Sequence, residues 1–450
     1  MARRVPAIQI YALLPKTNCR KCGVPTCMAF AIKLSAGEAE VDACPQLTPQ
    51  NRIKLQELLA PPVRRIVIGV GSRTLKIGGE EVLYRHEKRF NSPTAIAVAL
   101  SDTLSQERLK EAVAQVASFN IERMGQPLRV DALAVIDEAN SPESFSMAVE
   151  LASFSGLPLV LSSRRPEVLE AGLKVCGDLR PLIHAANSDN YIQMVELAAR
   201  FNCPLAIAGE GLDNVIDVVN RVAEFGLEDL VLDLTGRNPR STLSSLTLAR
   251  GLAVRFNVKG FGYPLMVFSP SYTGYGVYEA AILEAAMVAR YVSLLIIPSA
   301  EPWRLLPVLV TRQNLYTDPQ SPVQVKPGLY EVNKPDENSP VLVTTNYALT
   351  FHSVLEDARA SGVPCWILVV NTEGLSVATS IGGKKLTADV FIEAVKSSGL
   401  NERIKRKTLI IPGIAARFKG MVEEGTGWKV VVGPRESAGL TKFLRSYAAQ

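Results

Sequence analysis

Long apolar runs are missing from this sequence, and no stretch approaches the roughly 20 apolar residues that a membrane-spanning helix needs. The basic N-terminus reaches the first cysteine without an apolar segment of the kind found in signal peptides. The net charge is only +5 and no stripe of basic and aromatic residues stands out, so nothing supports nucleic-acid binding. Histidine is scarce, with three residues. We therefore expect a cytoplasmic protein that binds neither membranes nor nucleic acids.

Four of the seven cysteines are concentrated at the start of the chain, as Cys19, Cys22, Cys27 and Cys44. A C-x2-C-x4-C loop followed by a Cys-Pro pair can place four thiolates around a [4Fe–4S] cube. Zinc is the weaker alternative because four-cysteine zinc sites usually combine two C-x2-C pairs, and a disulfide is weaker still in a reducing compartment. We predict a [4Fe–4S] cluster and an anaerobic setting. The remaining cysteines are expected to be buried free thiols: Cys176, Cys203 and Cys365.

Residues 1–60 are expected to form a small module around this cluster. Residues 28–36 have helical spacing, and Gly37 suits a left-handed C-cap, which would bring Cys44 back over the first three cysteines. A second short helix is predicted before Pro61-Pro62, which end the module. Residues 61–92 are predicted to be a β-hairpin linker.

The region 93–316 repeats an apolar strand, a polar loop and an amphipathic helix. Eight strand candidates are apolar on both faces, as in a parallel sheet covered by helices: 95–100, 132–136, 159–162, 182–186, 205–208, 230–234, 265–268 and 292–297. Helices such as 144–154 and 190–201 lie between them. This pattern predicts a (β/α)8 TIM-type barrel, and an open doubly wound sheet is the alternative.

Polar residues follow several of these strands: Asp137, Glu138, Ser163, Arg164, Asn187, Ser188, Asp189, Glu210 and Asp233. At the carboxyl mouth of a barrel they could line a substrate pocket. They could equally be loop residues that face water and cap helices. Both interpretations stay open because no pair has a spacing tied to one reaction.

Residues 317–340 are rich in proline and polar residues and are predicted to be an interdomain linker. From 341 to 450 a second α/β pattern has strands at 341–345, 366–371, 409–412 and 430–433 and helices at 349–361 and 387–398. It predicts a small doubly wound (Rossmann-like) sheet with a crevice at the carboxyl ends of its strands. Small residues in the loops there would admit a large flat ligand close to backbone N–H groups. No nucleophile–base pair is evident, so chemistry would come from a cofactor, although ordinary loops are the alternative.

These features occur together in one known family. The four-cysteine motif with Gly23 and Phe30-Ala31, the eight βα units, and the loops Thr-Thr-Asn-Tyr (344–347) and Asn-Thr-Glu-Gly (371–374) resemble the large (gamma) subunit of the corrinoid/iron–sulfur protein. That protein belongs to the anaerobic acetyl-CoA (Wood–Ljungdahl) pathway, and the family includes the gamma subunits of acetyl-CoA decarbonylase/synthase. The resemblance covers the whole chain in order, and the cysteine motif is its most specific part.

The resemblance implies a methyl-group carrier in one-carbon metabolism and carbon fixation. In that family the terminal domain binds a cobamide, a cobalamin-type corrinoid. Its cobalt(I) accepts methyl from methyltetrahydrofolate, or methyltetrahydrosarcinapterin, through a methyltransferase and delivers it to acetyl-CoA synthase. The implied partners are a barrel-shaped small subunit in a heterodimer, the methyltransferase, acetyl-CoA synthase/CO dehydrogenase, and a reductive activator or ferredoxin. The chain would be the cofactor-bearing component of a corrinoid-dependent methyltransferase system.

Many corrinoid domains supply cobalt with a histidine from an Asp-x-His-x-x-Gly motif, and none of His86, His184 and His352 lies in one. We therefore expect a base-off cobamide without a protein imidazole. Without an axial donor cobalt(II) is easier to reduce, and the cluster is expected to reactivate it reductively. By loop position the expected corrinoid contacts are Thr344, Thr345, Asn346, Thr350, Thr372, Glu373, Gly374, Leu375, Ser376, Gly413, Ala415, Gly433, Pro434 and Arg435.

Two other functions stay open. A pterin-dependent methyltransferase could work in the barrel, with Asp137, Asn187 and Asp233 holding the pterin. A simple iron–sulfur electron carrier would contain iron without cobalt.

Overall fold

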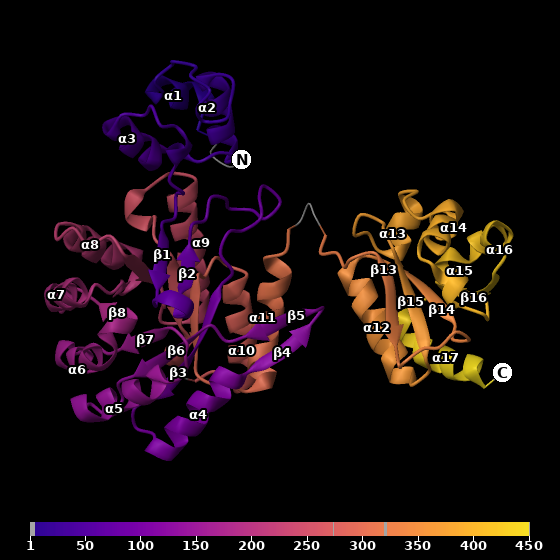
Figure 1. The fold of residues 1–450 in the computed structure, drawn as a ribbon. Coiled ribbons are helices and arrows are strands. Elements are labelled where there is room, and N and C mark those ends of the chain that lie inside the picture. Colours follow the sequence, from indigo (N-terminus) through magenta and orange to yellow (C-terminus); the bar gives the residue numbers. More distant parts are fainter. Residues whose placement is uncertain (1–4, 273, 319–321, 450) are drawn as a thin grey trace. The chain divides into compact units, whose positions relative to one another are not determined.

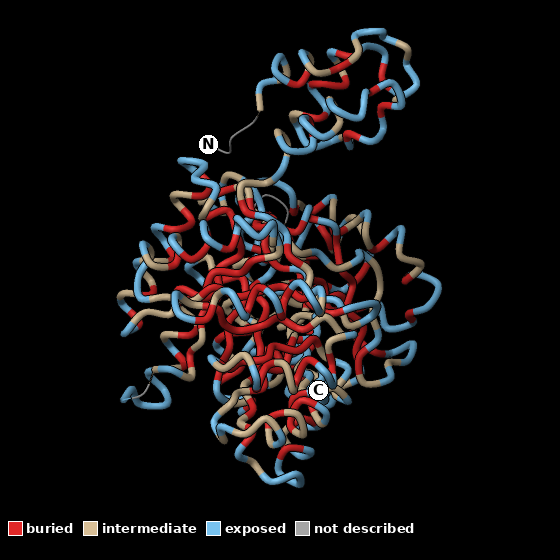
Figure 2. Tube along the Cα trace, turned by 90° about the vertical axis from the view of Figure 1, so that its left-hand side faces the viewer, coloured by how far each residue is buried: buried red, intermediate tan, exposed pale blue. Residues whose placement is uncertain are grey.

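The computed structural model describes residues 5–272, 274–318 and 322–449 and divides the chain into two compact units (Figure 1). The first contains the chain up to Ile121 and Leu128–Tyr316, and the second contains Glu122–Pro127 and the chain from Thr317 on. Buried residues are concentrated in the interior of the larger unit and exposed ones on its outside (Figure 2). Within the described ranges, no helix combines the length and the apolar character that crossing a membrane requires.

Three short helices and a 3-10 turn form the cysteine-containing start of the chain. They are α1 (Ala7–Leu13), α2 (Cys27–Ala36), η1 (Val41–Ala43) and α3 (Pro49–Leu59). Helix α2 ends at Gly37 with φ 73°, which confirms the predicted left-handed C-cap. The short α1 was not predicted. Its Ile10 packs with Phe30 of α2 and Leu55 of α3 in a small core.

The predicted hairpin is confirmed: β1 (Arg65–Ile68) and β2 (Leu75–Gly78) pair antiparallel around η2 (Gly71–Arg73). Its buried Ile66, Ile68 and Ile77 belong to the same apolar cluster as the alanines inside the barrel. Two of those alanines, Ala95 and Ala132, are the first residues of their strands, so the hairpin closes the amino-terminal end of the barrel.

Eight parallel strands close into a barrel in the order β10-β11-β12-β3-β6-β7-β8-β9, which confirms the (β/α)8 prediction over the open sheet. The strands are β3 (Ala95–Ser101), β6 (Ala132–Ile136), β7 (Leu159–Ser162), β8 (Leu182–Ala186), β9 (Leu205–Ala208), β10 (Leu230–Asp233), β11 (Leu265–Phe268) and β12 (Leu294–Ile297). The helices are α4 (Gln106–Ser118), α5 (Pro142–Ser153), α6 (Pro166–Cys176), α7 (Tyr191–Phe201), α8 (Gly211–Ala223), α9 (Pro239–Val254), α10 (Val277–Val288) and α11 (Pro302–Leu315).

Alternating side chains explain why the barrel strands are apolar on both faces. Along β3, Ala95 and Ala97 face the barrel interior, whereas Ile96 and Val98 join the cluster formed with the surrounding helices. Short turns lie in the loops: η3 (Gly177–Leu179), η4 (Lys259–Phe261) and η5 (Ser269–Ser271). A small hairpin of β4 (Asn120–Arg123) and β5 (Gln126–Arg129) precedes β6 and was not predicted.

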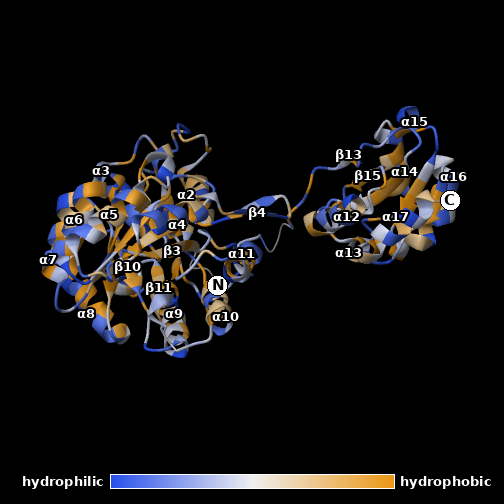
Figure 3. Ribbon diagram, turned by 90° about the horizontal axis from the view of Figure 1, so that it is seen from below, coloured by the Kyte–Doolittle hydropathy of each residue, from blue (hydrophilic) through white to orange (hydrophobic). Residues whose placement is uncertain are grey.

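The second unit contains a five-stranded sheet in the order β13-β15-β14-β16-β17. The strands are β13 (Gly328–Val332), β14 (Val341–Thr345), β15 (Cys365–Val370), β16 (Thr408–Ile411) and β17 (Lys429–Val432), and Figure 3 shows the sheet in the colours of hydrophobic residues. The helical elements are α12 (Ala348–Ser361), α13 (Val377–Gly382), α14 (Ala388–Ser397), α15 (Leu400–Arg403), η6 (Gly413–Phe418), α16 (Lys419–Thr426), η7 (Ser437–Gly439) and α17 (Leu440–Ala448).

Helices cover both faces of this sheet, as the doubly wound prediction requires. Phe351 of α12 and Leu444 of α17 pack on one face with Leu342. Phe391 of α14 and Val422 of α16 pack on the other face, where the neighbouring residues of β14 point. The successive residues of β14 therefore alternate between the two cores.

The segment 317–340, which we expected to be a linker, contributes the edge strand β13. It pairs antiparallel with β15 from Gly328 to Val332, whereas the other four strands are parallel. The prolines around it conceal this strand in the sequence, because proline is tolerated next to an edge strand but is typical of linkers.

Candidate functional site

The loop between α1 and α2 carries Cys19 and Cys22 and leads directly to Cys27, the first residue of α2. It coils through left-handed backbone at Lys16, Asn18, Arg20 and Gly23, with φ between 47° and 79°. The side-chain oxygen of Asn18 accepts a hydrogen bond of 2.8 Å from the backbone N–H of Cys27. This contact fixes the loop to the first residue of α2 and keeps the cysteines in one module.

The surroundings of the cysteines in this module differ. Cys27 is the first residue of α2. The backbone N–H of Lys21 and, to a smaller extent, the Thr17 side chain lower the pKa of the Cys19 thiol. Cys27 and Cys44 are buried, whereas Cys19 and Cys22 are partly exposed.

The donor set of this module, four thiols, is that of a [4Fe–4S] cluster. All seven cysteines of the chain are free thiols. Among the described residues, no group of three or more His, Cys, Asp or Glu side chains is close enough to hold a metal ion. The prediction of a cluster at these thiols therefore depends on the number of cysteines and on their grouping at the start of the sequence.

The other three cysteines are buried, as predicted: Cys176, Cys203 and Cys365. Burial raises the pKa of each thiol to about 12. They are thus apolar packing groups that stay protonated at neutral pH.

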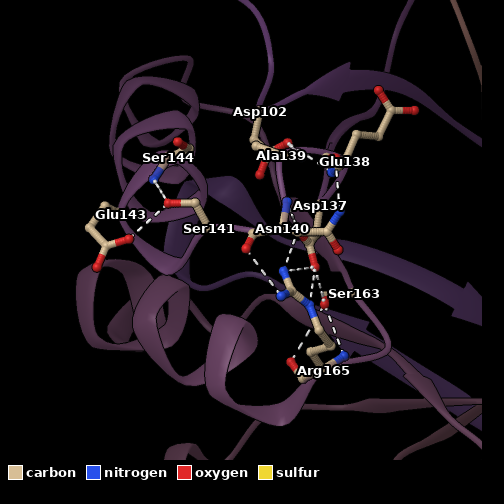
Figure 4. A network of polar contacts seen from close by, with 10 residues as sticks. All are labelled: Asp102, Asp137, Glu138, Ala139, Asn140, Ser141, Glu143, Ser144, Ser163 and Arg165. Carbon is tan, nitrogen blue, oxygen red and sulfur yellow. Dashed lines mark hydrogen bonds and ion pairs between the residues drawn. The ribbon is translucent and has the colours of Figure 1, made fainter.

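Polar residues that follow β6 and β7 at the barrel mouth bond to one another (Figure 4). Asp137 accepts hydrogen bonds from Arg165 at 2.9 Å and from the Ser163 hydroxyl at 2.6 Å. Asn187 accepts bonds from the backbone of its own loop, and Asp233 bonds to Thr235. The three residues that a pterin site would need are therefore all engaged within the chain, as expected of loop-capping residues.

The three histidines lie in different parts of the fold and have different surroundings. His184 is buried between Ser162, at 2.8 Å, and Asp233, at 2.9 Å, and it stacks on Phe268. His352 belongs to α12, and burial lowers its pKa. His86 stacks on a tyrosine in the hairpin linker.

A cavity of about 370 Å³ lies at the carboxyl edge of the second-unit sheet. In this sheet β14 lies between β15 and β16. The chain leaves β14 towards β15 on one side and leaves β16 towards β17 on the other side. Such a reversal of strand order is a topological switch point, where a crevice opens at the carboxyl ends of the strands. The cavity is lined by Leu342, Val343, Thr344, Leu349, Thr350, Ser353, Val354, Ser376, Val377, Ala378, Ile410, Ile411, Pro412, Ile414, Gly433, Pro434, Arg435, Glu436, Ser437 and Leu440.

Six of the expected contact residues line this cavity: Thr344, Thr350, Ser376, Gly433, Pro434 and Arg435. The other eight lie outside its lining: Thr345, Asn346, Thr372, Glu373, Gly374, Leu375, Gly413 and Ala415. Several of these eight shape the loops instead. The amide of Asn346 accepts hydrogen bonds from the backbone N–H groups of Thr372 and Gly374, at 2.9 and 3.0 Å.

Two features of the crevice favour a binding site. Thr344 lines the cavity, and its hydroxyl is buried and has no hydrogen-bond partner among the described residues. A Cβ at Gly413 would lie 2.8 Å from the Arg435 backbone nitrogen, so glycine lets the loops after β16 and β17 meet. Exposed Arg435 and Glu436 are the two charged residues in a mainly apolar lining.

Sequence reasoning missed most of the apolar lining. Leu349 and Val354 belong to the first turns of α12, and Leu440 begins α17. The position of each helix directly after a strand could have indicated these residues. A helix that starts beside a strand end has one side of its first two turns towards the crevice.

Residues 65–444 match the family model described as "CO dehydrogenase/acetyl-CoA synthase delta subunit", and residues 14–46 match one described as "Putative Fe-S cluster". The chain is 40% identical to the acetyl-CoA decarbonylase/synthase complex subunit gamma of Methanothermobacter thermautotrophicus, over 99% of this chain and 100% of that protein. It is 39% identical to the corrinoid/iron-sulfur protein large subunit of Moorella thermoacetica, over 98% and 99%. Among solved structures, dihydropteroate synthase of Thermus thermophilus matches with a TM-score of 0.38 at 18% identity, over 56% of this chain and 100% of that one.

Proposed function

Because the chain belongs to the family of the acetyl-CoA decarbonylase/synthase gamma subunits and the corrinoid/iron–sulfur protein large subunit, we propose that it carries methyl groups on a bound cobamide. The observation that supports this most is the presence, in one chain, of a four-thiol module and a crevice at a sheet switch point. When bound, the cobamide supplies the cobalt atom that holds the methyl group. The chain's own residues supply the binding surface.

In this proposal the crevice of the second unit holds the cobamide. Thr344, Thr350 and Ser376 offer hydroxyl groups, and Gly433 leaves room beside the end of β17. Arg435 provides a cation for the phosphodiester of the nucleotide arm. The cavity is in the size range of small-molecule sites, so it receives part of the cobamide rather than enclosing it.

The four thiols of the N-terminal module are proposed to hold the [4Fe–4S] cluster that returns oxidised cobamide to its reactive state. None of the three histidines lines the crevice, which supports a cobamide without a protein imidazole. The names of the relatives place them in a multi-subunit complex, and we propose the same for this chain, with a delta-type small subunit, a methyltransferase and acetyl-CoA synthase as partners.

Metal analysis tests this function directly. We expect protein purified without oxygen to contain four irons and one cobalt per chain, with the ultraviolet–visible bands of a corrinoid over those of a cluster. Iron without cobalt after incubation with excess cobamide would contradict the proposal and favour an electron carrier. Tight binding of methyltetrahydrofolate by this chain alone would favour a methyltransferase.

A further inference from the structure

A short segment of chain lies at the carboxyl edge of the second-unit sheet, ahead of β13. It pairs antiparallel with the loop that follows β14. The backbone N–H of Val325 donates to the Asn346 carbonyl oxygen at 2.9 Å. In the other direction, the N–H of Ala348 donates to the Val323 carbonyl oxygen, also at 2.9 Å. We call Val323, Gln324 and Val325 the entry segment, because the chain passes through it after α11 and before the sheet.

The entry segment caps helix α12. Tyr347, the residue before this helix, makes no side-chain capping hydrogen bond. The first N–H groups of a helix have no partner within the helix. Ala348, the first residue of α12, is 1% exposed, and the Val323 carbonyl oxygen supplies the partner that its N–H needs. Without the entry segment this buried donor would be unpaired, which favours fraying of the first turn of α12.

The turn that the entry segment caps is also a wall of the crevice. Leu349 and Thr350, which directly follow the capped residue, line the cavity. Fraying of the first turn would displace both side chains from the lining. The crevice is therefore complete only while the entry segment is bound to the loop after β14.

The side chain of Gln324 fastens the entry segment to the neighbouring loops. Its oxygen accepts a hydrogen bond of 3.0 Å from the amide nitrogen of Asn346, which is 1% exposed. It also lies against Gly374, where φ is 77° and a Cβ would be 2.6 Å from the Gln324 Cγ. Glycine thus lets the loop after β15 touch the entry segment. Gln324 is exposed and lies outside the lining of the cavity, so it can affect a ligand only through its neighbours.

We propose that the entry segment positions α12 for cobamide binding, with Gln324 as a positioning residue, so that docking of this segment and occupancy of the crevice stabilise each other. This inference rests on the proposed function, which places the cobamide in the crevice. Coupling between two binding events is reciprocal, so the cobamide must hold the entry segment as strongly as the segment supports the cobamide. The chain between α11 and β13 thereby gains a direct effect on cofactor retention.

The test compares variants of the complete chain, produced without cobalt, in equilibrium dialysis with hydroxocobalamin. Val325→Pro removes the N–H that donates to Asn346, and the extended Gln324 before it accepts a following proline. Gln324→Met removes the acceptor oxygen at nearly constant size. Each loses one hydrogen bond and should raise the Kd about three- to tenfold. Gln324→Glu keeps an acceptor oxygen and should bind like wild type, as should the control Gln115→Met at an exposed position of α4.

Hydrogen exchange separates positioning from a purely structural role. In wild type, saturating hydroxocobalamin should slow the exchange of the Val325 and Ala348 amides by at least the factor by which Gln324→Met weakens binding. In ligand-free Gln324→Met both amides should exchange faster than in wild type. A segment that only stabilises the fold would show the second effect without the first. Gln324→Met carries the test alone if Val325→Pro does not fold.

Two results would overturn the inference. The first is an unchanged hydroxocobalamin affinity in the variants that lose a hydrogen bond. The second is bound hydroxocobalamin that leaves the Val325 and Ala348 amides at their ligand-free exchange rates. Equal weakening by Gln324→Met and Gln324→Glu would overturn the role of the Gln324 oxygen. A wild-type chain that binds no hydroxocobalamin would contradict the proposed function itself, whereas normal binding with either of the two results means that only the coupling is wrong.

Discussion

Asn346 and Thr372 are joined by two hydrogen bonds, from the backbone N–H of Thr372 at 2.9 Å and from its hydroxyl at 3.1 Å, both to the Asn346 side-chain oxygen. The same oxygen accepts the N–H of Gly374, and the amide nitrogen donates to Gln324 at 3.0 Å. One buried amide thus holds together the loops that follow β14 and β15 and the segment before β13. These loops form one side of the carboxyl edge where the crevice lies.

Replacing Asn346 by alanine should destabilise the second unit. The substitution leaves two buried N–H groups without a partner, and each costs about 1–3 kcal/mol. We expect a loss of about 2–6 kcal/mol in the free energy of unfolding, together with weaker cobamide binding. Denaturant titration followed by the fluorescence of Trp366 and Trp428 measures the first effect. Asn338→Ala, at an exposed position, is the control and should change neither quantity.

Thr344 and Thr345 form a matched pair for testing the crevice. Both hydroxyls are buried without a partner among the described residues, but only Thr344 lines the cavity. Replacing either by valine removes an unsatisfied polar group, so both ligand-free variants should gain about 1 kcal/mol of stability. Only Thr344→Val should also bind cobamide more weakly, by about three- to tenfold, because it loses a hydrogen bond. If equilibrium dialysis gives the same cobamide affinity for both variants, the cobamide does not bind in this crevice.

The fold was largely predictable because strands buried on both faces leave uninterrupted apolar runs, such as Leu159–Ser162. The edge strand β13 and helix α1 were missed for the opposite reason. Both are short, lie beside prolines and obtain their order from neighbours distant in sequence. Strand ends pointed to Thr344 and Arg435, and both line the cavity. The hydrogen bonds that hold Asn346 between its neighbouring loops depend on the folded chain and leave no pattern in the sequence.

The buried thiol of Cys365 should make the second unit less stable in alkali. Its pKa is about 12 in the folded protein against 9.0 in the unfolded chain, because burial disfavours the thiolate. Below pH 9 both states hold the proton and the stability is unaffected. As the pH rises from 9 towards 12 only the unfolded state ionises, and stability falls by about 1.4 kcal/mol per pH unit.

The contribution of Cys365 is isolated by comparison with Cys365→Ala, because tyrosines and lysines also titrate at high pH. The variant should be less stable than wild type at pH 7, where a buried side chain has lost packing contacts. The difference in the free energy of unfolding between wild type and variant should decrease steadily above pH 9. Denaturant titration measures this difference. If it is constant from pH 7 to 11, folding does not raise the pKa of this thiol.

Loss of one cluster thiol should remove the iron–sulfur cluster and leave the cobamide in place. Cys19→Ala removes one of the four donors, so we expect the anaerobically purified variant to lose its iron and the cluster absorbance. Cobalt content should stay at one per chain because the crevice residues belong to the other unit. Methyl transfer should begin normally and then decline, since the chain cannot be re-reduced after an occasional oxidation. Turnover over time, with and without an added chemical reductant, measures this decline.

Cys203→Ala controls for the loss of a thiol as such. Cys203 is buried in the barrel with its sulfur 3.4 Å from the Phe201 carbonyl oxygen, and its pKa of about 12 keeps it protonated. Its removal should cost some stability but leave iron, cobalt and sustained turnover unchanged. If Cys19→Ala recovers from oxidation as fast as Cys203→Ala under the same electron donor, the reducing electrons reach the cobamide without passing through the N-terminal module.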